Sequence, residues 1–114
     1  MSLKDKINED IKSAIKGGNA EAVSVLRLLN SAVKNKELEK RRRLAREGKP
    51  PAELEALSSL SDEEMIGVIL GEIKKRKESI AQYSAGGREE LAKKEAAELA
   101  ILKKYVPEKM KNEA

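Results

Sequence analysis

The sequence has 114 residues, of which 39% are apolar, 39% are charged and only 2% are aromatic, and its formal net charge is +4. It contains no Cys and no His, which excludes disulfides, the usual zinc ligands, a cysteine nucleophile and the commonest general base at neutral pH. With so few aromatic residues, aliphatic side chains must build the core, and amphipathic helices with charged outer faces suit this composition.

Length and segment pattern indicate a single domain over residues 1–114. No segment approaches the roughly 20 consecutive apolar residues that span a bilayer. The N-terminal residues lack the apolar stretch of a signal peptide. We therefore expect a cytoplasmic protein without a membrane partner.

Apolar residues at helical spacing predict a first helix over residues 3–16. Ser2 and Asp5 have the spacing of a capping box, with Asp in place of the usual Glu. Gly17 and Gly18 end the helix, because Gly readily adopts the left-handed conformation of a C-cap.

Asn19 is a suitable N-cap for a second helix, which we expect to run to about Glu47, where Gly48 and two prolines end it. Its apolar stripe lies in the first half and contains an unusual charge, Arg27, which must reach the rim or pair with an acid. Residues 34–49 hold eight basic and three acidic residues, so the basic excess of the chain is concentrated at the far end of this helix.

Residues 52–57 are compatible with a short helix or with a loop, since prolines and serines flank them. Ser61 and Glu64 form a second capping box at the start of the next helix. The pattern then predicts an antiparallel hairpin of helices over about 62–84 and 88–105. The expected fold class is therefore all-α, a four-helix domain with a long basic second helix.

The apolar stripes of the two hairpin helices are each interrupted by one charge. Counting back from the Gly86-Gly87 turn places Lys77 level with Glu95. An opposed Lys and Glu can satisfy each other where either alone would be costly to bury. We predict a structural pair between them.

The basic run of the second helix is the clearest functional signal. Consecutive helical positions point in different directions, so this run surrounds the helix with positive charge, which suits a phosphate backbone. A solvated, functionally neutral helix end is the competing interpretation. The residues predicted to bind RNA are Lys40, Arg41, Arg42, Arg43 and Arg46, with Lys75 and Arg88 as second choices.

No set of residues indicates catalysis, a metal site or a cofactor. A serine triad is impossible without His, and no phosphate loop or dinucleotide motif is present. Gly86-Gly87-Arg88 has the elements of an anion site, but a tight turn explains the glycines equally well.

Several segments resemble the YqeY-like family. The resemblance covers nearly the whole chain, and the residues that carry it are Leu3, Ile7, Asp10 and Ile11, the stretch Val25-Leu26-Arg27-Leu28-Leu29 with Ala32, Lys34-Asn35 and Glu37, and the hairpin from Glu72-Ile73-Lys74-Lys75-Arg76-Lys77-Glu78-Ser79-Ile80 to Tyr105-Val106-Pro107.

The resemblance implies an all-helical fold related to the C-terminal, tRNA-binding region of the B subunit of glutamine-dependent tRNA amidotransferase. It associates the chain with carbon-nitrogen ligase chemistry that uses glutamine as amido donor, although we expect no catalysis by this chain alone. It implies tRNA and an amidotransferase or synthetase subunit as partners. Compared with the family, residues 44–60 look like an insertion or linker, and the C-terminal tail domain is expected to be absent.

The alternative function is a protein–protein interaction module that docks a helical face on a partner subunit. Its candidate contacts lie outside the evident apolar stripes: Leu38, Leu44, Leu54 and Leu57.

Overall fold

The computed structural model describes residues 1–111, and these residues form an all-helical fold without strands. The all-α prediction is confirmed. The structure has five α-helices and a short 3-10 helix: α1 (Leu3–Lys16), α2 (Ala20–Arg46), α3 (Pro51–Ser58), α4 (Asp62–Ala85), α5 (Glu89–Lys103) and η1 (Glu108–Met110).

The structure has one α-helix more than the four predicted, and the additional helix is α3, over a segment whose sequence suits a helix or a loop. Pro51 occupies its first position, where a fixed φ favours helix and the missing N–H costs nothing. Leu54 is buried, and α3 packs along the end of α2. Tertiary burial therefore decides an element for which the local sequence was ambiguous.

Side-chain caps fix the starts of three helices. The Oγ of Ser2 accepts the N–H of Asp5 at 3.1 Å, and the Oδ1 of Asn19 accepts the N–H of Ala22 at 3.1 Å. The Oγ of Ser61 accepts the N–H of Glu64 at 3.1 Å. Each bond satisfies a backbone donor that the first turn leaves unpaired.

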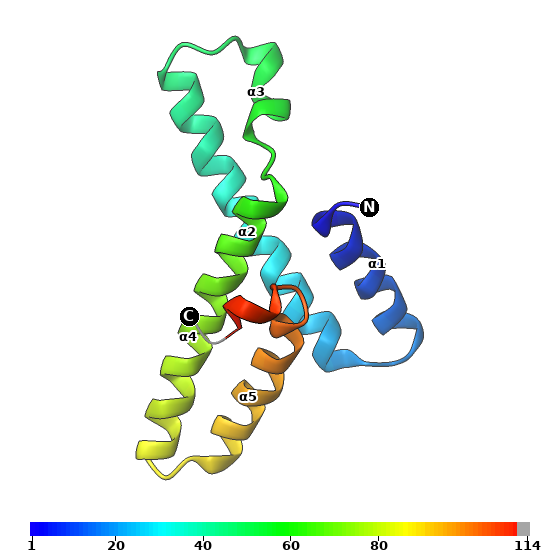
Figure 1. The fold of residues 1–114 in the computed structure, drawn as a ribbon, viewed down its shortest axis with the longest axis vertical. Helices are drawn as coiled ribbons and strands as arrows, with labels where there is room; N and C mark the ends of the chain where they lie inside the picture. Colours follow the sequence, from blue (N-terminus) through cyan, green and yellow to red (C-terminus); the bar gives the residue numbers. More distant parts are fainter. Residues whose placement is uncertain (112–114) are drawn as a thin grey trace.

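The molecule is elongated, with extents of 52 × 33 × 24 Å. Figure 1 shows that α2 and α3 form an arm at one end, while α4 and α5 run antiparallel and meet in a turn at the other. Helix α1 lies beside the N-terminal half of α2. The C-terminal half of α2 thus projects beyond the middle of the molecule.

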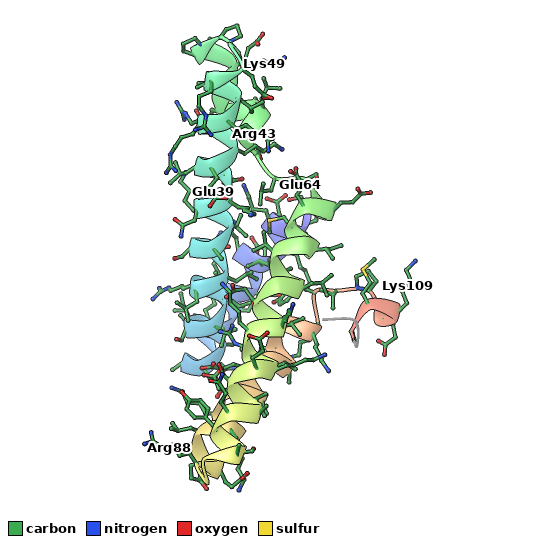
Figure 2. The ribbon with its side chains drawn as sticks, turned by 90° about the vertical axis from the view of Figure 1, so that its left-hand side faces the viewer. Glu39, Arg43, Lys49, Glu64, Arg88 and Lys109 are labelled. Carbon is green, nitrogen blue, oxygen red and sulfur yellow. The ribbon has the colours of Figure 1, made fainter. Side chains whose placement is uncertain are left out.

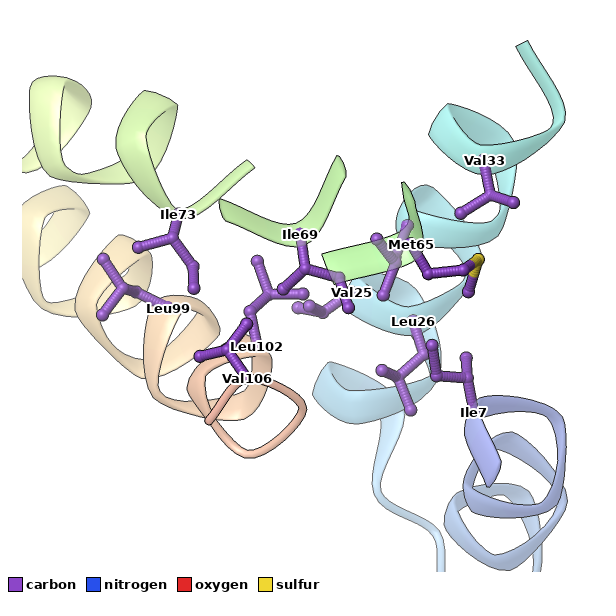
Figure 3. Packing of buried hydrophobic residues seen from close by; sticks show 11 residues of the cluster. Ile7, Val25, Leu26, Val33, Met65, Ile69, Ile73, Leu99, Leu102 and Val106 are labelled. Atoms are coloured by element: carbon purple, nitrogen blue, oxygen red, sulfur yellow. The ribbon is translucent and has the colours of Figure 1, made fainter. Parts of the chain in front are cut away.

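The core lies where α1, α2, α4 and α5 meet (Figure 3). It is built from aliphatic side chains and one methionine, all nearly inaccessible to solvent: Ile7, Val25, Leu26, Leu29, Val33, Met65, Ile69, Ile73, Leu99, Leu102 and Val106. Tyr105 borders this cluster and donates its hydroxyl to Asp10 at 2.5 Å. Burial, and secondly this bond, raises the pKa of Tyr105.

The cation buried between α4 and α5 is Arg76. Its guanidinium lies 3.5 Å from Glu72 and 3.6 Å from Glu98, so two carboxylates balance its charge. Lys77 and Glu95 are half-buried, and their pairing stays a prediction.

Candidate nucleic-acid interface on helix α2

The candidate interface is the basic segment, residues 34–49, on the arm formed by α2 and α3. Figure 2 shows Glu39, Arg43 and Lys49 along this arm. Arg41, Arg42, Arg43 and Arg46 are exposed, whereas the side chain of Lys40 is only 20% exposed. The four arginines therefore present their charge to solvent from a projecting helix.

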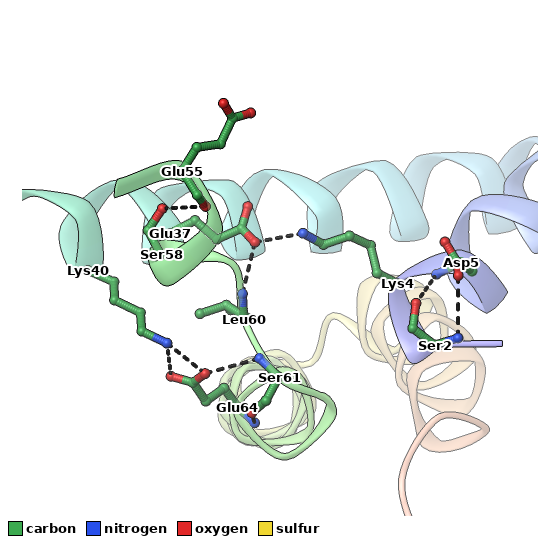
Figure 4. Close-up of polar contacts among 10 residues, drawn as sticks. All are labelled: Ser2, Lys4, Asp5, Glu37, Lys40, Glu55, Ser58, Leu60, Ser61 and Glu64. Carbon is green, nitrogen blue, oxygen red and sulfur yellow. Dashed lines mark hydrogen bonds and ion pairs between the residues drawn. The ribbon is translucent and has the colours of Figure 1, made fainter. Parts of the chain in front are cut away.

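Three cations of the basic segment have acidic partners. Lys36 lies 3.5 Å from Glu39, and Arg43 lies 4.0 Å from Glu47, both along the helix surface. Lys40 donates to both carboxylate oxygens of Glu64, at 2.9 and 3.0 Å (Figure 4).

Five cations of the segment have no carboxylate oxygen within 4.0 Å among residues 1–111: Lys34, Arg41, Arg42, Arg46 and Lys49. The charge of Lys34 acts on Glu37 from farther away, so Arg41, Arg42, Arg46 and Lys49 are the four without an acidic partner. An unpaired exposed cation keeps its full charge for an anionic ligand, since it need not first break an internal pair. Three of the five residues predicted for the basic helix are thus unpaired, and Lys40 is the most engaged.

Two grooves flank the basic part of α2. One, of about 410 Å³, lies against α3 and includes Lys4, Lys34 and Arg41 in its wall. The other, of about 380 Å³, faces the start of α4 and includes Lys36, Arg43 and Arg46. Each groove also includes two glutamates, so cations outnumber carboxylates in both walls.

Two glutamates, Glu37 and Glu64, connect the arm to the rest of the molecule (Figure 4). Glu37 accepts from Lys4 at 2.6 Å and from the N–H of Leu60 at 3.0 Å. Burial raises the pKa of the Glu37 carboxyl, but the bonds from Lys4 and Leu60 outweigh it, so that its pKa is lowered.

Glu64 fastens α2 to the start of α4. It accepts from the N–H of Ser61 at 3.0 Å, which completes the capping box of α4, and it also holds Lys40. The Ser61 bond, followed by the Lys40 bond, lowers the pKa of Glu64 to about 2. The carboxylate is thus ionised at neutral pH and fixes the base of the arm.

The two second-choice residues lie in different places. Arg88 lies at the end of the molecule opposite Lys49 (Figure 2). Lys75 lies on α4, pairs with Glu72 at 3.3 Å, and borders a groove that also contains Lys36 and Gly71. Lys75 can extend the interface along α4, whereas Arg88 belongs to a separate surface.

The four leucines of the alternative function differ in exposure. Leu54 is buried against α2 and is unavailable to a partner, which corrects that prediction. Leu44 is half-buried, while Leu38 and Leu57 are exposed. The four residues therefore do not form one docking face.

Arg27 is exposed on α2. Of the two alternatives expected for this charge, reaching the rim or pairing with an acid, the structure shows the first. It lines a groove between α1 and α2. The groove was not predicted from the sequence. The available signal was Leu28, an apolar residue next to Arg27 that falls outside the stripe that packs into the core.

Within residues 1–111, no group of three or more acidic residues is arranged to hold a metal ion. None of the helices described is long and apolar enough to cross a membrane.

Fold and surface together define an all-helical protein with a projecting basic helix. The family model described as Yqey-like protein matches residues 4–114. The chain therefore belongs to the YqeY-like family. No curated protein gives a significant match to the chain.

Proposed function

We propose that this protein is a non-catalytic accessory domain that binds structured RNA, and tRNA in particular, through the basic segment of α2. The setting proposed is one related to glutamine-dependent tRNA amidotransferase, with an amidotransferase or synthetase subunit as partner. The observation that carries the proposal is the group of four unpaired cations, Arg41, Arg42, Arg46 and Lys49, on a helix that projects from the core.

Backbone recognition suits this surface better than base recognition. Phosphates are bound by Lys and Arg without regard to sequence. Stacking of unpaired bases relies chiefly on aromatic side chains, and the two tyrosines of the chain lie on α4 and two residues beyond the end of α5. The ligand that fits is thus a folded RNA whose duplex regions present regularly spaced phosphates.

The test is a fluorescence-anisotropy titration of labelled tRNA over a range of salt concentrations. Four phosphate contacts would give a slope of about −3 to −4 in log K against log salt, or roughly a hundredfold loss of affinity between 50 and 200 mM. No binding at the lowest salt would contradict the proposal. A duplex RNA should compete better than an unstructured single strand of equal length.

A salt-insensitive interaction with a protein subunit would instead favour the alternative function, since burial of apolar surface responds weakly to ionic strength. For that alternative, Leu38 and Leu57 are the accessible members of the predicted contact set.

A further inference from the structure

A second surface, away from the basic segment, has the character of a protein-docking groove. It is a cleft of about 700 Å³ between the end of α1 and the first half of α2. Its apolar lining includes Ala14, Ile15, Val23 and Leu28, and Gly18 also lines it. Ile15 and Leu28 are 53% and 55% exposed.

The exposure of Leu28 follows from its place in the helix. Leu26 and Leu29 point into the core, so Leu28 must face away from it. Solvation of this side chain and of Ile15 is unfavourable, and burying a leucine against a partner recovers about 1.5 to 3 kcal/mol. Two such side chains, one from each of the helices that line the groove, therefore favour an apolar ligand that contacts both.

The dimensions of the groove match a helix. Its α2 wall extends from Ala20 to Ser31, which at 1.5 Å per residue is roughly 17 Å, or three helical turns. An amphipathic helix with apolar residues at positions i, i+3 or i+4, and i+7 presents a stripe of that length.

Charge defines the partner further. Arg27 is the charged residue that lines the groove, and within residues 1–111 it has no carboxylate within 4.0 Å. A helix with an Asp or Glu beside its apolar stripe would complement it. A second copy of this chain docked symmetrically on the same groove would bring two Arg27 side chains together, which is unfavourable.

We propose that the groove between α1 and α2 binds a short amphipathic helix of another protein, with its apolar residues between Ile15 and Leu28 and its carboxylate paired with Arg27. Leu28 and Arg42 are 14 positions apart on one helix, or roughly 21 Å. The groove and the basic segment of α2 therefore share no residue. The proposal is independent of the RNA-binding function.

The test is selection from a displayed library of 14-residue helical peptides, with leucines fixed at positions i, i+3 and i+7 and the other positions randomised. The full chain serves as bait. Selected peptides should be enriched in Asp or Glu beside the leucine stripe. Their affinity should fall at least tenfold for Leu28→Asp, and far less for the control Leu91→Asp, which alters an exposed leucine on α5.

A charge exchange then tests the pairing. Arg27→Glu should weaken the acidic peptides, and a peptide in which the acid is replaced by Lys should recover affinity for Arg27→Glu. Melting curves establish that both variants fold, as expected because Arg27 and Leu28 are exposed.

Three outcomes would overturn the proposal. The first is an absence of enriched peptides, and the second is equal binding to Leu28→Asp and to the unaltered chain. The third is self-association of the chain in sedimentation experiments that is abolished by Leu28→Asp, because the occupant would then be a second copy.

Discussion

Lys75 and Arg76 are neighbours in the sequence but lie in opposite surroundings. The side chain of Lys75 is 76% exposed, whereas that of Arg76 is 10% exposed and lies between Glu72 and Glu98. A buried cation costs free energy unless carboxylates balance it, and removing one member of such a group leaves the others unbalanced.

We therefore expect Arg76→Ala to lower the free energy of unfolding by about 3 kcal/mol or more, because two poorly solvated carboxylates would be left facing each other. Lys75→Ala should cost no more than about 1 kcal/mol, as for other surface pairs. Urea denaturation followed by circular dichroism measures both. Equal losses for the two variants would show that Arg76 does not hold the helices together.

In the hairpin, the interruptions in the apolar stripes predicted a pair of Lys77 and Glu95, and that pair stays a prediction. The buried cation of the structure is the preceding residue, Arg76. Its burial could not be predicted, because adjacent helical positions differ by about 100° and a long side chain can reach across that difference. Arg27, the other charge set among apolar residues, faces solvent.

At the scale of single elements, α4 contains two glycines that the rest of the molecule does not require. A Cβ added at Gly67 or Gly71 would meet no atom within 4 Å. Glycine in a helix interior is less stable than alanine, since more backbone freedom is lost on folding. We expect Gly67→Ala and Gly71→Ala each to raise the free energy of unfolding by about 1 kcal/mol.

Gly87 provides the matched control for the glycine variants. A Cβ at this position would also meet no atom within 4 Å, but its φ is +74°, a conformation unfavourable for L-residues. Gly87→Ala should therefore lower the melting temperature, whereas the two α4 variants raise it. A melting temperature that fell in all three would contradict this explanation.

The attachment of α2 to α4 should depend on acid pH through Glu64. Its pKa is lowered from 4.5 to about 2 in the folded protein. The stability that this carboxylate contributes is thus fully present above pH 4.5 and is lost as pH falls toward 2. In Glu64→Gln, thermal melting should depend less on pH across this interval. An unchanged pH profile would mean that Glu64 does not fasten the arm.

Element boundaries followed closely from the sequence where caps are present. The helix predicted over 3–16 matches α1, and the capping box at Ser61 marks the start of α4. Helix α3 could not be settled in this way, because prolines and serines at its ends suit a loop equally, and the burial of Leu54 depends on a neighbouring helix.

At the scale of the whole molecule, the packing of the helices places residues far apart that the sequence analysis had grouped in one site. Arg88 was grouped with the basic run as a second choice, yet it lies at the opposite end from Lys49. The sequence shows where the basic residues lie along the chain. Their positions in space depend on how α4 and α5 pack against α2. For the same reason the groove at Leu28 was not predicted.

A charge-matched comparison of two variants tests most directly whether the basic segment of α2 binds RNA. One variant combines Arg41→Gln, Arg42→Gln and Arg46→Gln, which removes three unpaired cations of the arm. The other combines Lys12→Gln, Lys93→Gln and Lys94→Gln, which removes three exposed cations of α1 and α5. Both variants have the same net charge, so any difference reports position.

The measurement is tRNA affinity as a function of salt for the two variants and the unaltered chain. The arm variant should bind at least tenfold more weakly at low salt, with a slope of log K against log salt reduced in magnitude by about 2 to 3. The control variant should stay within about threefold of the unaltered chain, since distant charges are screened. Equal weakening in both variants, or unchanged binding by the arm variant, would contradict the assignment of the basic segment of α2 as the RNA-binding surface.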